Sequence, residues 1–174
     1  MSNHTILTIG AFIVLTTILQ NFYRLLGNTG DDIAGAQDMI LATTIATSYL
    51  EMAQGLAFDE VTDTSSLALG NAAALTAPYA LGRDDADEDS VHKFDDFDDF
   101  HRFSIERTAT GTNRRFATSF AVSYVNPSDV SQTSTTRTFL KRIDLTTWRS
   151  YPPSEGSPLD TLRLSLVMGY FHFD

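Results

Sequence analysis

The chain has 174 residues, no cysteine and a formal net charge of −10 from 22 acidic and 12 basic residues. The lack of cysteine excludes disulfides and cysteine-based metal sites. The acidic balance argues against nucleic acid as a partner, because phosphate binding requires a basic surface. The length suits one domain with an appendage.

The chain begins with a long apolar segment, residues 6–26, and the only charged residue in the first thirty is Arg24. About 20 apolar residues in a helix, roughly 30 Å, cross the hydrocarbon core of a bilayer. Because no basic residue precedes the segment and no small-residue cleavage site follows it, we expect it to be retained rather than removed as a signal peptide. It must then be buried in lipid or against other copies of the chain.

Two helices are expected in this part of the chain, over residues 3–26 and 32–56. Two glycines between positions 27 and 30 predict a break, since each costs about 1 kcal/mol inside a helix. Asp31 and Asp32 would then cap the second helix. Its apolar stripe is expected to pack on the sheet of its own domain and on neighbouring subunits. The stripe consists of Met39, Ala42, Ala46, Tyr49, Ala53 and Leu56.

An acidic stretch follows, in which residues 84–99 hold nine of the 22 carboxylates. Asp85, Asp87 and Asp89 match the one-three-five spacing of an EF-hand calcium loop, and Asp96 falls at its twelfth position. Calcium would neutralise carboxylates that repel one another. The alternative is a solvated loop without metal, because the sixth position of the loop lacks the glycine of an EF-hand.

Aromatic residues recur every three positions at the end of the acidic stretch, at Phe94, Phe97, Phe100 and Phe103. This spacing predicts a short helical turn whose aromatic edge enters the core while the aspartates between the rings face water.

The rest of the chain has the period-two alternation of strands with one buried face. The expected strands cover residues 102–108, 114–126, 136–148 and 161–173. Together these elements predict an α+β chain. A helical stem over residues 1–57, broken at 27–30, would precede a globular domain over residues 58–174 built on an antiparallel sheet of about four strands.

The sequence predicts no enzyme. The four histidines, His4, His92, His101 and His172, have no metal-ligand partner at helical spacing. The chain also has no phosphate-binding loop and no nucleophile motif. We therefore expect no catalytic residue and no cofactor other than the calcium considered above.

The order of elements and several short motifs resemble type IV pilins and the pseudopilins of type II secretion. The matching segments are the helix end at 46–61, the Phe-Asp-Asp-Phe-Asp-Asp-Phe run at 94–100, the Lys-Arg-Ile strand at 139–145 and the last strand at 160–165. The family usually has Glu at the fifth mature position, where this chain has Thr5. The resemblance implies, first, a pilin-like fold.

The resemblance further implies a structural subunit of an extracellular pilus-like filament on the cell surface, a helical homopolymer of the chain itself. Its precursor would be embedded in the inner membrane and handled by the pilus assembly machinery. Small residues allow helices to approach closely, and polar side chains hydrogen-bond between helices. On these grounds the expected assembly contacts are Gly10, Ala11, Thr16, Thr17 and Gln20.

Two alternatives remain open at this point. One is a minor pseudopilin or initiator subunit of a type II secretion or type IV pilus machine. The other is a single-pass membrane anchor that displays a binding domain on the cell surface. The sequence does not distinguish adhesion, motility and DNA uptake.

Overall fold

The computed structural model describes residues 2–64, 69–84, 88–152 and 161–171. The chain divides into two compact units, Met1–Ile40 and Leu41–Asp174. This division differs from the expected boundary between residues 57 and 58. Ala46, Tyr49 and Ala53 are buried in the hydrophobic core of the second unit, so this end of the helix groups with the sheet.

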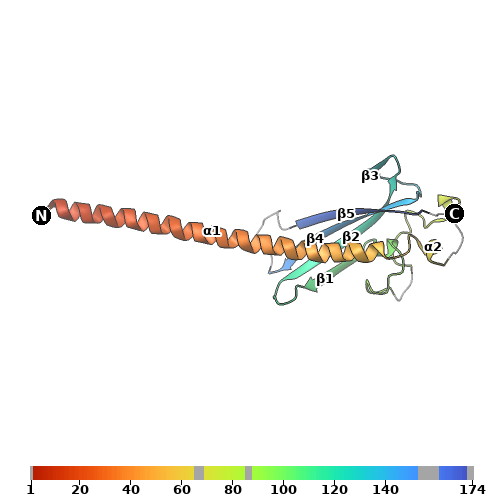
Figure 1. Cartoon of the computed structure of the whole chain (residues 1–174), viewed down its shortest axis with the longest axis horizontal. Coiled ribbons are helices and arrows are strands. Elements are labelled where there is room, and N and C mark those ends of the chain that lie inside the picture. The colour runs from red at the N-terminus through yellow and green to blue at the C-terminus, as the bar shows by residue number, and fades with distance from the viewer. Residues whose placement is uncertain (1, 65–68, 85–87, 153–160, 172–174) are drawn as a thin grey trace. The chain divides into compact units, whose positions relative to one another are not determined.

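Helix α1 runs without interruption over Ser2–Gln54 (Figure 1). The predicted break at residues 27–30 and the separate second helix over 32–56 are therefore wrong. A break would leave four N–H and four C=O groups without helical partners at the new ends. That costs more than two glycines at about 1 kcal/mol each. Within this stretch Thr29 Oγ1 donates to the carbonyl of Leu25 at 2.9 Å, as in a helix interior.

An antiparallel sheet follows, with the strand order β1-β2-β4-β5 and β3 paired with the end of β2 (Figure 1). Its strands are β1 (Ser104–Thr108), β2 (Arg115–Asn126), β3 (Asp129–Thr133), β4 (Leu140–Tyr151) and β5 (Thr161–Gly169). The sheet has five strands rather than about four. The sequence does not reveal β3 because all five of its residues are exposed and show no alternation.

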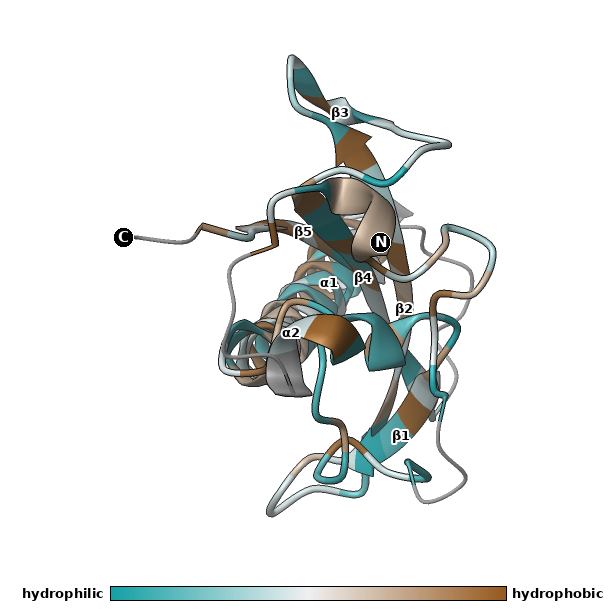
Figure 2. Cartoon of the chain, turned by 90° about the vertical axis from the view of Figure 1, so that its right-hand side faces the viewer, coloured by the Kyte–Doolittle hydropathy of each residue, from teal (hydrophilic) through white to brown (hydrophobic). Residues whose placement is uncertain are grey.

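The core lies between the end of α1 and one face of the sheet. Inward residues alternate along β2 and β4, so that Phe120 is paired with Leu145 and Val122 with Ile143. Figure 2 shows the corresponding alternation of hydrophilic and hydrophobic positions along the strands. The small alanines of α1 let the helix lie close to these side chains. The chain therefore has the expected α+β architecture.

Short helical segments complete the second unit between α1 and β1. They are α2 (Glu60–Thr64), η1 (Ala72–Ala74) and η2 (Asp98–Phe100). A parallel bridge joins Ala57 to Asp96. In it Ala57 N donates to Asp95 O at 3.1 Å and Phe97 N donates to Ala57 O at 2.9 Å. This bridge brings the chain after α1 beside the aspartates that precede η2.

Candidate functional site

The most distinctive surface of the chain is the exposed part of α1, residues 4–33, which we call the stem surface. Every residue in this range is exposed. Thirteen large apolar side chains between residues 6 and 26 are 45–75% exposed. By length and composition α1 could cross a membrane, and none of its apolar window is buried within the chain. A helix that is apolar on all sides belongs in lipid or in the core of a larger structure.

The five predicted contact residues all lie on the stem surface. Gly10, Ala11, Thr16, Thr17 and Gln20 are each exposed. A Cβ added to Gly10 would meet no atom within 4 Å, so nothing in its own chain requires a glycine there. Thr16 Oγ1 donates to Phe12 O and Thr17 Oγ1 to Ile13 O, both at 2.8 Å. Since both hydroxyls are satisfied inside the helix, they are compatible with apolar surroundings.

The predicted calcium ligands lie in several settings. Asp85 and Asp87 lie outside the described residues. Asp89 is exposed and pairs with Lys93 at 2.9 Å. Asp96 is buried, and its Oδ1 accepts the N–H of Asp98 at 2.8 Å. The calcium site stays a prediction, which a shift in melting temperature on adding chelator would test.

A different group of carboxylates does converge in the structure. Ligand oxygens of Asp84, Glu88 and Asp99 lie within 4.8 Å of one another. Glu88 Oε2 accepts the backbone N–H of Asp84 at 3.1 Å, and Asp99 Oδ2 accepts that of Asp95 at 3.1 Å. These bonds show that two of the carboxylates also serve the local turns. The calcium-loop spacing did not select this group because Asp84 and Asp99 fall outside its ligand positions.

The aromatic turn is placed as expected, but three of the four aspartates between its rings are not. Phe94, Phe97 and Phe100 are buried in the main core. Asp96 and Asp98, predicted to face water, are only 3% and 2% exposed. Both carboxylates have hydrogen-bond partners inside the fold, because Lys141 on β4 contacts Asp98, and the backbone N–H groups of Asp98 and Asp99 donate to Asp96.

The principal partner is Lys141, a fully buried lysine on β4. Its Nζ donates to the backbone carbonyl of Phe58 at 2.7 Å and to Asp59 Oδ2 at 2.7 Å. It also contacts Asp98 Oδ1. The rings of Phe58 and Tyr124 lie 4.7 and 5.5 Å from Nζ. We call Lys141, Asp59 and Asp98 the buried lysine cluster.

Asp59 is held from several sides. Its carboxylate accepts the backbone N–H of Thr76 at 3.0 Å and the Oγ1–H of the same residue at 3.2 Å. The hydroxyl of Tyr124 donates to Thr76 O at 2.7 Å and lies 3.3 Å from Asp59 Oδ2. Asp59 thus joins the end of α1, the loop before η2 and the sheet through one side chain.

The electrostatics of this region favour the protonated forms of its carboxyl groups. Burial raises the pKa of Asp98. Burial, with the neighbouring charge of Asp98, raises the pKa of Asp96 to about 7. Burial and the charge of Asp96 raise the pKa of Asp99 to about 7. Several carboxylates share few cations here, so ionising all of them together is costly.

The sequence carried one signal for this cluster. Lys141 has the same strand parity as Ile143 and Leu145, which predicts an inward side chain. A lysine inside a core requires a carboxylate partner. The partners themselves were not predictable locally, since Asp59 and Asp98 lie 82 and 43 residues away.

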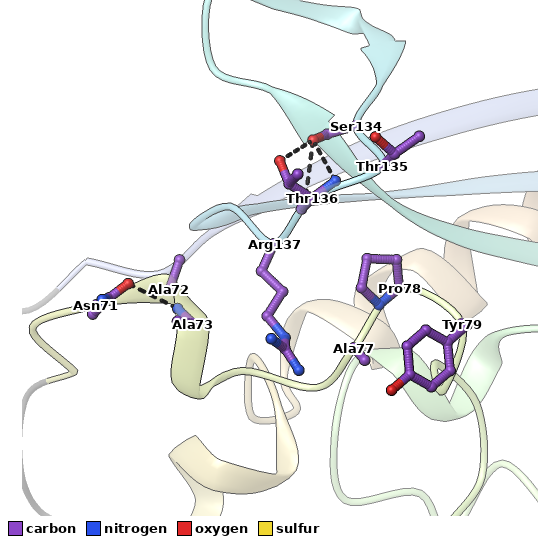
Figure 3. Close-up of a pocket in the computed structure, with 10 residues that line it drawn as sticks. All are labelled: Asn71, Ala72, Ala73, Ala77, Pro78, Tyr79, Ser134, Thr135, Thr136 and Arg137. Carbon is purple, nitrogen blue, oxygen red and sulfur yellow. Dashed lines mark hydrogen bonds between the residues drawn. The ribbon is translucent and has the colours of Figure 1, made fainter.

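The second unit also has an open surface hollow of about 810 Å³ beside η1 (Figure 3). Figure 3 shows Arg137 extending into it between η1 and the segment that carries Pro78 and Tyr79. Two polar groups on its rim are engaged with neighbours, since Asn71 Oδ1 accepts Ala73 N–H at 2.9 Å and Ser134 bonds to Thr136. Its described lining residues contain no acid–base pair that would indicate catalysis.

No family model, curated protein or solved structure matches this chain.

Proposed function

We propose that the chain is the structural subunit of an extracellular pilus-like filament, assembled through the stem surface in the manner of type IV pilins. The observation that carries this proposal is that every residue of 4–33 is exposed and that this range includes the apolar segment 6–26. An α+β second unit following such a helix is the arrangement that the sequence motifs led us to expect.

The energetic argument concerns the thirteen exposed apolar side chains. Burying each contributes about 1.5–3 kcal/mol, so together they contribute on the order of 20–40 kcal/mol. A whole domain is stable by only about 5–15 kcal/mol. The stem surface is therefore buried by something outside the chain, first the inner membrane and then sister helices in the filament.

Transfer from membrane to filament needs a further driving force, because lipid is as apolar as a helix bundle. Close packing and hydrogen bonds between helices supply it. Gly10 and Ala11 have the smallest side chains, so the backbone of a neighbouring helix can approach closely at these positions. Gln20 provides an amide that needs a partner in apolar surroundings. Thr16 and Thr17 add small side chains whose hydroxyls are already satisfied.

The test is to shear surface appendages from cells that express the chain, image them by electron microscopy and identify their peptides. The proposal expects helical filaments in which this chain is the dominant protein and which persist in mild detergent. If the chain is only a rare component of such filaments, it is an initiator or minor pseudopilin. If the chain dissolves in detergent as a monomer and no filaments form, the assembly proposal is wrong.

A further inference from the structure

The buried lysine cluster places an amine against two carboxyl groups in a site closed to water. Lys141 and Asp59 have fully buried side chains, and that of Asp98 is 3% exposed. Nζ contacts Asp98 Oδ1, so the carboxyl carbon of Asp98 is one bond beyond the contacting atom. Reaction between two groups held in this way is favoured because the cost of bringing them together has already been met by folding.

The second carboxylate is positioned to accept a proton. Asp59 Oδ2 lies 2.7 Å from Nζ, and Thr76 and Tyr124 fix its orientation. Burial raises the pKa of Asp98, which favours the protonated form that can lose its hydroxyl as water. The backbone N–H of Asp98 donates to Asp96 Oδ1 at 2.8 Å, which fixes the electrophile as well.

We propose that Lys141 and Asp98 become joined by an amide bond between their side chains, with Asp59 as the proton acceptor. The bond would tie β4 to η2 and close a covalent loop over residues 98–141. In a chain without cysteine, this is a covalent cross-link that the buried residues themselves can form. The inference does not depend on the proposed filament.

The reaction balances with water as the only leaving group. The Lys141 ammonium gives one proton to the Asp59 carboxylate, and the neutral amine attacks Cγ of protonated Asp98. The new N–C bond forms and one C–O bond of Asp98 breaks. Of the two remaining amine protons, one stays on the amide nitrogen and one leaves with the hydroxyl of Asp98 as water. Asp59 ends protonated, so charge is conserved, and neither an oxidant nor another reactant is needed.

The burial of the site favours the product. Amide formation releases water, and the side chains of Lys141 and Asp59 are fully buried, with the Phe58 and Tyr124 rings 4.7 and 5.5 Å from Nζ. The bond also replaces a buried ammonium and a buried carboxyl group with one neutral amide, which removes the cost of keeping a charge from solvent.

The experiment is intact mass spectrometry of the full chain, purified folded in detergent and then denatured. Wild type and Lys141→Arg are prepared together, so that any processing common to both cancels. Arginine keeps the charge but does not form the amide. The mass difference between wild type and Lys141→Arg should exceed the difference between lysine and arginine by the mass of one water, because only wild type loses water. A peptide digest should contain one species in which residues 98 and 141 are joined.

Two further variants separate the chemistry from a folding defect. Asp59→Asn should fold, with Lys141 still paired to Asp98, but should keep the full mass because the proton acceptor is gone. Asp98→Asn should lose ammonia instead of water and give the same cross-linked product. A folded wild type with the full sequence mass overturns the proposal. So does a loss of water that persists in Lys141→Arg, since the water must then come from elsewhere.

Discussion

The ammonium group of Lys141, at the start of β4, lies 2.7 Å from the carboxylate of Asp59, in the chain just after α1. Both side chains are fully buried. This pair connects the end of the helix to the middle of the sheet. Because buried charges depend on their partners, it also makes this junction sensitive to single substitutions.

In a chain that carries no Lys141–Asp98 amide, replacing Lys141 with methionine should lower the free energy of unfolding by about 3–5 kcal/mol, because Asp59 and Asp98 would remain buried without their cation. Urea or thermal unfolding of the full chain in detergent measures the change. Lys93→Met is the matched control, since Lys93 pairs with Asp89 at the exposed surface. The control should unfold almost as wild type does. Equal losses in the two variants would contradict the assigned role of the cluster.

Stability should fall as the pH rises from about 4 to about 7. Burial raises the pKa of Asp96 from 3.8 to about 7, so in this range the folded chain holds a proton that the unfolded chain has released. Unfolding then releases protons and becomes easier at higher pH, with little further effect above about pH 7. The melting temperature should accordingly be higher at pH 5 than at pH 8.

Asp96→Asn isolates this effect. Asparagine keeps an oxygen that accepts the N–H groups of Asp98 and Asp99, but it does not ionise. The variant should lose much of the decline between pH 5 and pH 8. Burial lowers the pKa of His101, which has the opposite effect on stability, but this contribution is common to both proteins. If the melting temperature of Asp96→Asn falls between pH 5 and pH 8 as much as that of wild type, a group other than Asp96 holds the proton.

Phe97→Ala should destabilise the second unit by about 3–5 kcal/mol, because the ring of Phe97 is completely buried and its removal leaves a cavity. Tyr79→Ala removes a similar ring that is 90% exposed at the open hollow, and should change stability by less than about 0.5 kcal/mol. Chemical denaturation of both variants checks the difference. Comparable effects would place the core elsewhere.

Gly10→Leu should strongly reduce filament formation, because a large side chain at Gly10 would hold neighbouring helices apart. The fold of the second unit should be unchanged, since nothing lies within 4 Å of the added Cβ. Ile13→Leu is the control, because it conserves volume on the same helix. Filament yield by electron microscopy and circular dichroism of the purified chain give the two readouts. Normal filaments from Gly10→Leu would refute the packing model.

The sequence predicted those parts of the fold in which one face is buried. Alternation identified β2 and β5, whereas β3 has no buried residue and left no such pattern. The uninterrupted course of α1 was missed because the local cost of Gly27 and Gly30 was weighed without the cost of two additional helix ends.

The candidate sites divide in the same way. The stem surface was predictable because its apolar character is continuous in sequence. Lys141 was detectable from its strand parity, but Asp98 was expected to face water. Its burial depends on β4 and on the chain after α1, which fold against η2 from distant parts of the sequence. Contacts of this kind have no local pattern.

The connection after Gln54 bears on how the chain responds to tension. A pull on the sheet reaches α1 through the core contacts of Ala46, Tyr49 and Ala53 and through residues 55–59, which are held by the Ala57 backbone bridge and by Lys141. The Ala57 bridge and the Lys141 contacts both lie within a few residues of the helix end. A pulling force that passes through residues 55–59 is therefore divided between these two interactions. A chain pulled along its length would therefore resist extension at this joint until the buried ammonium is torn from its acceptors or, where the amide has formed, until a covalent bond breaks.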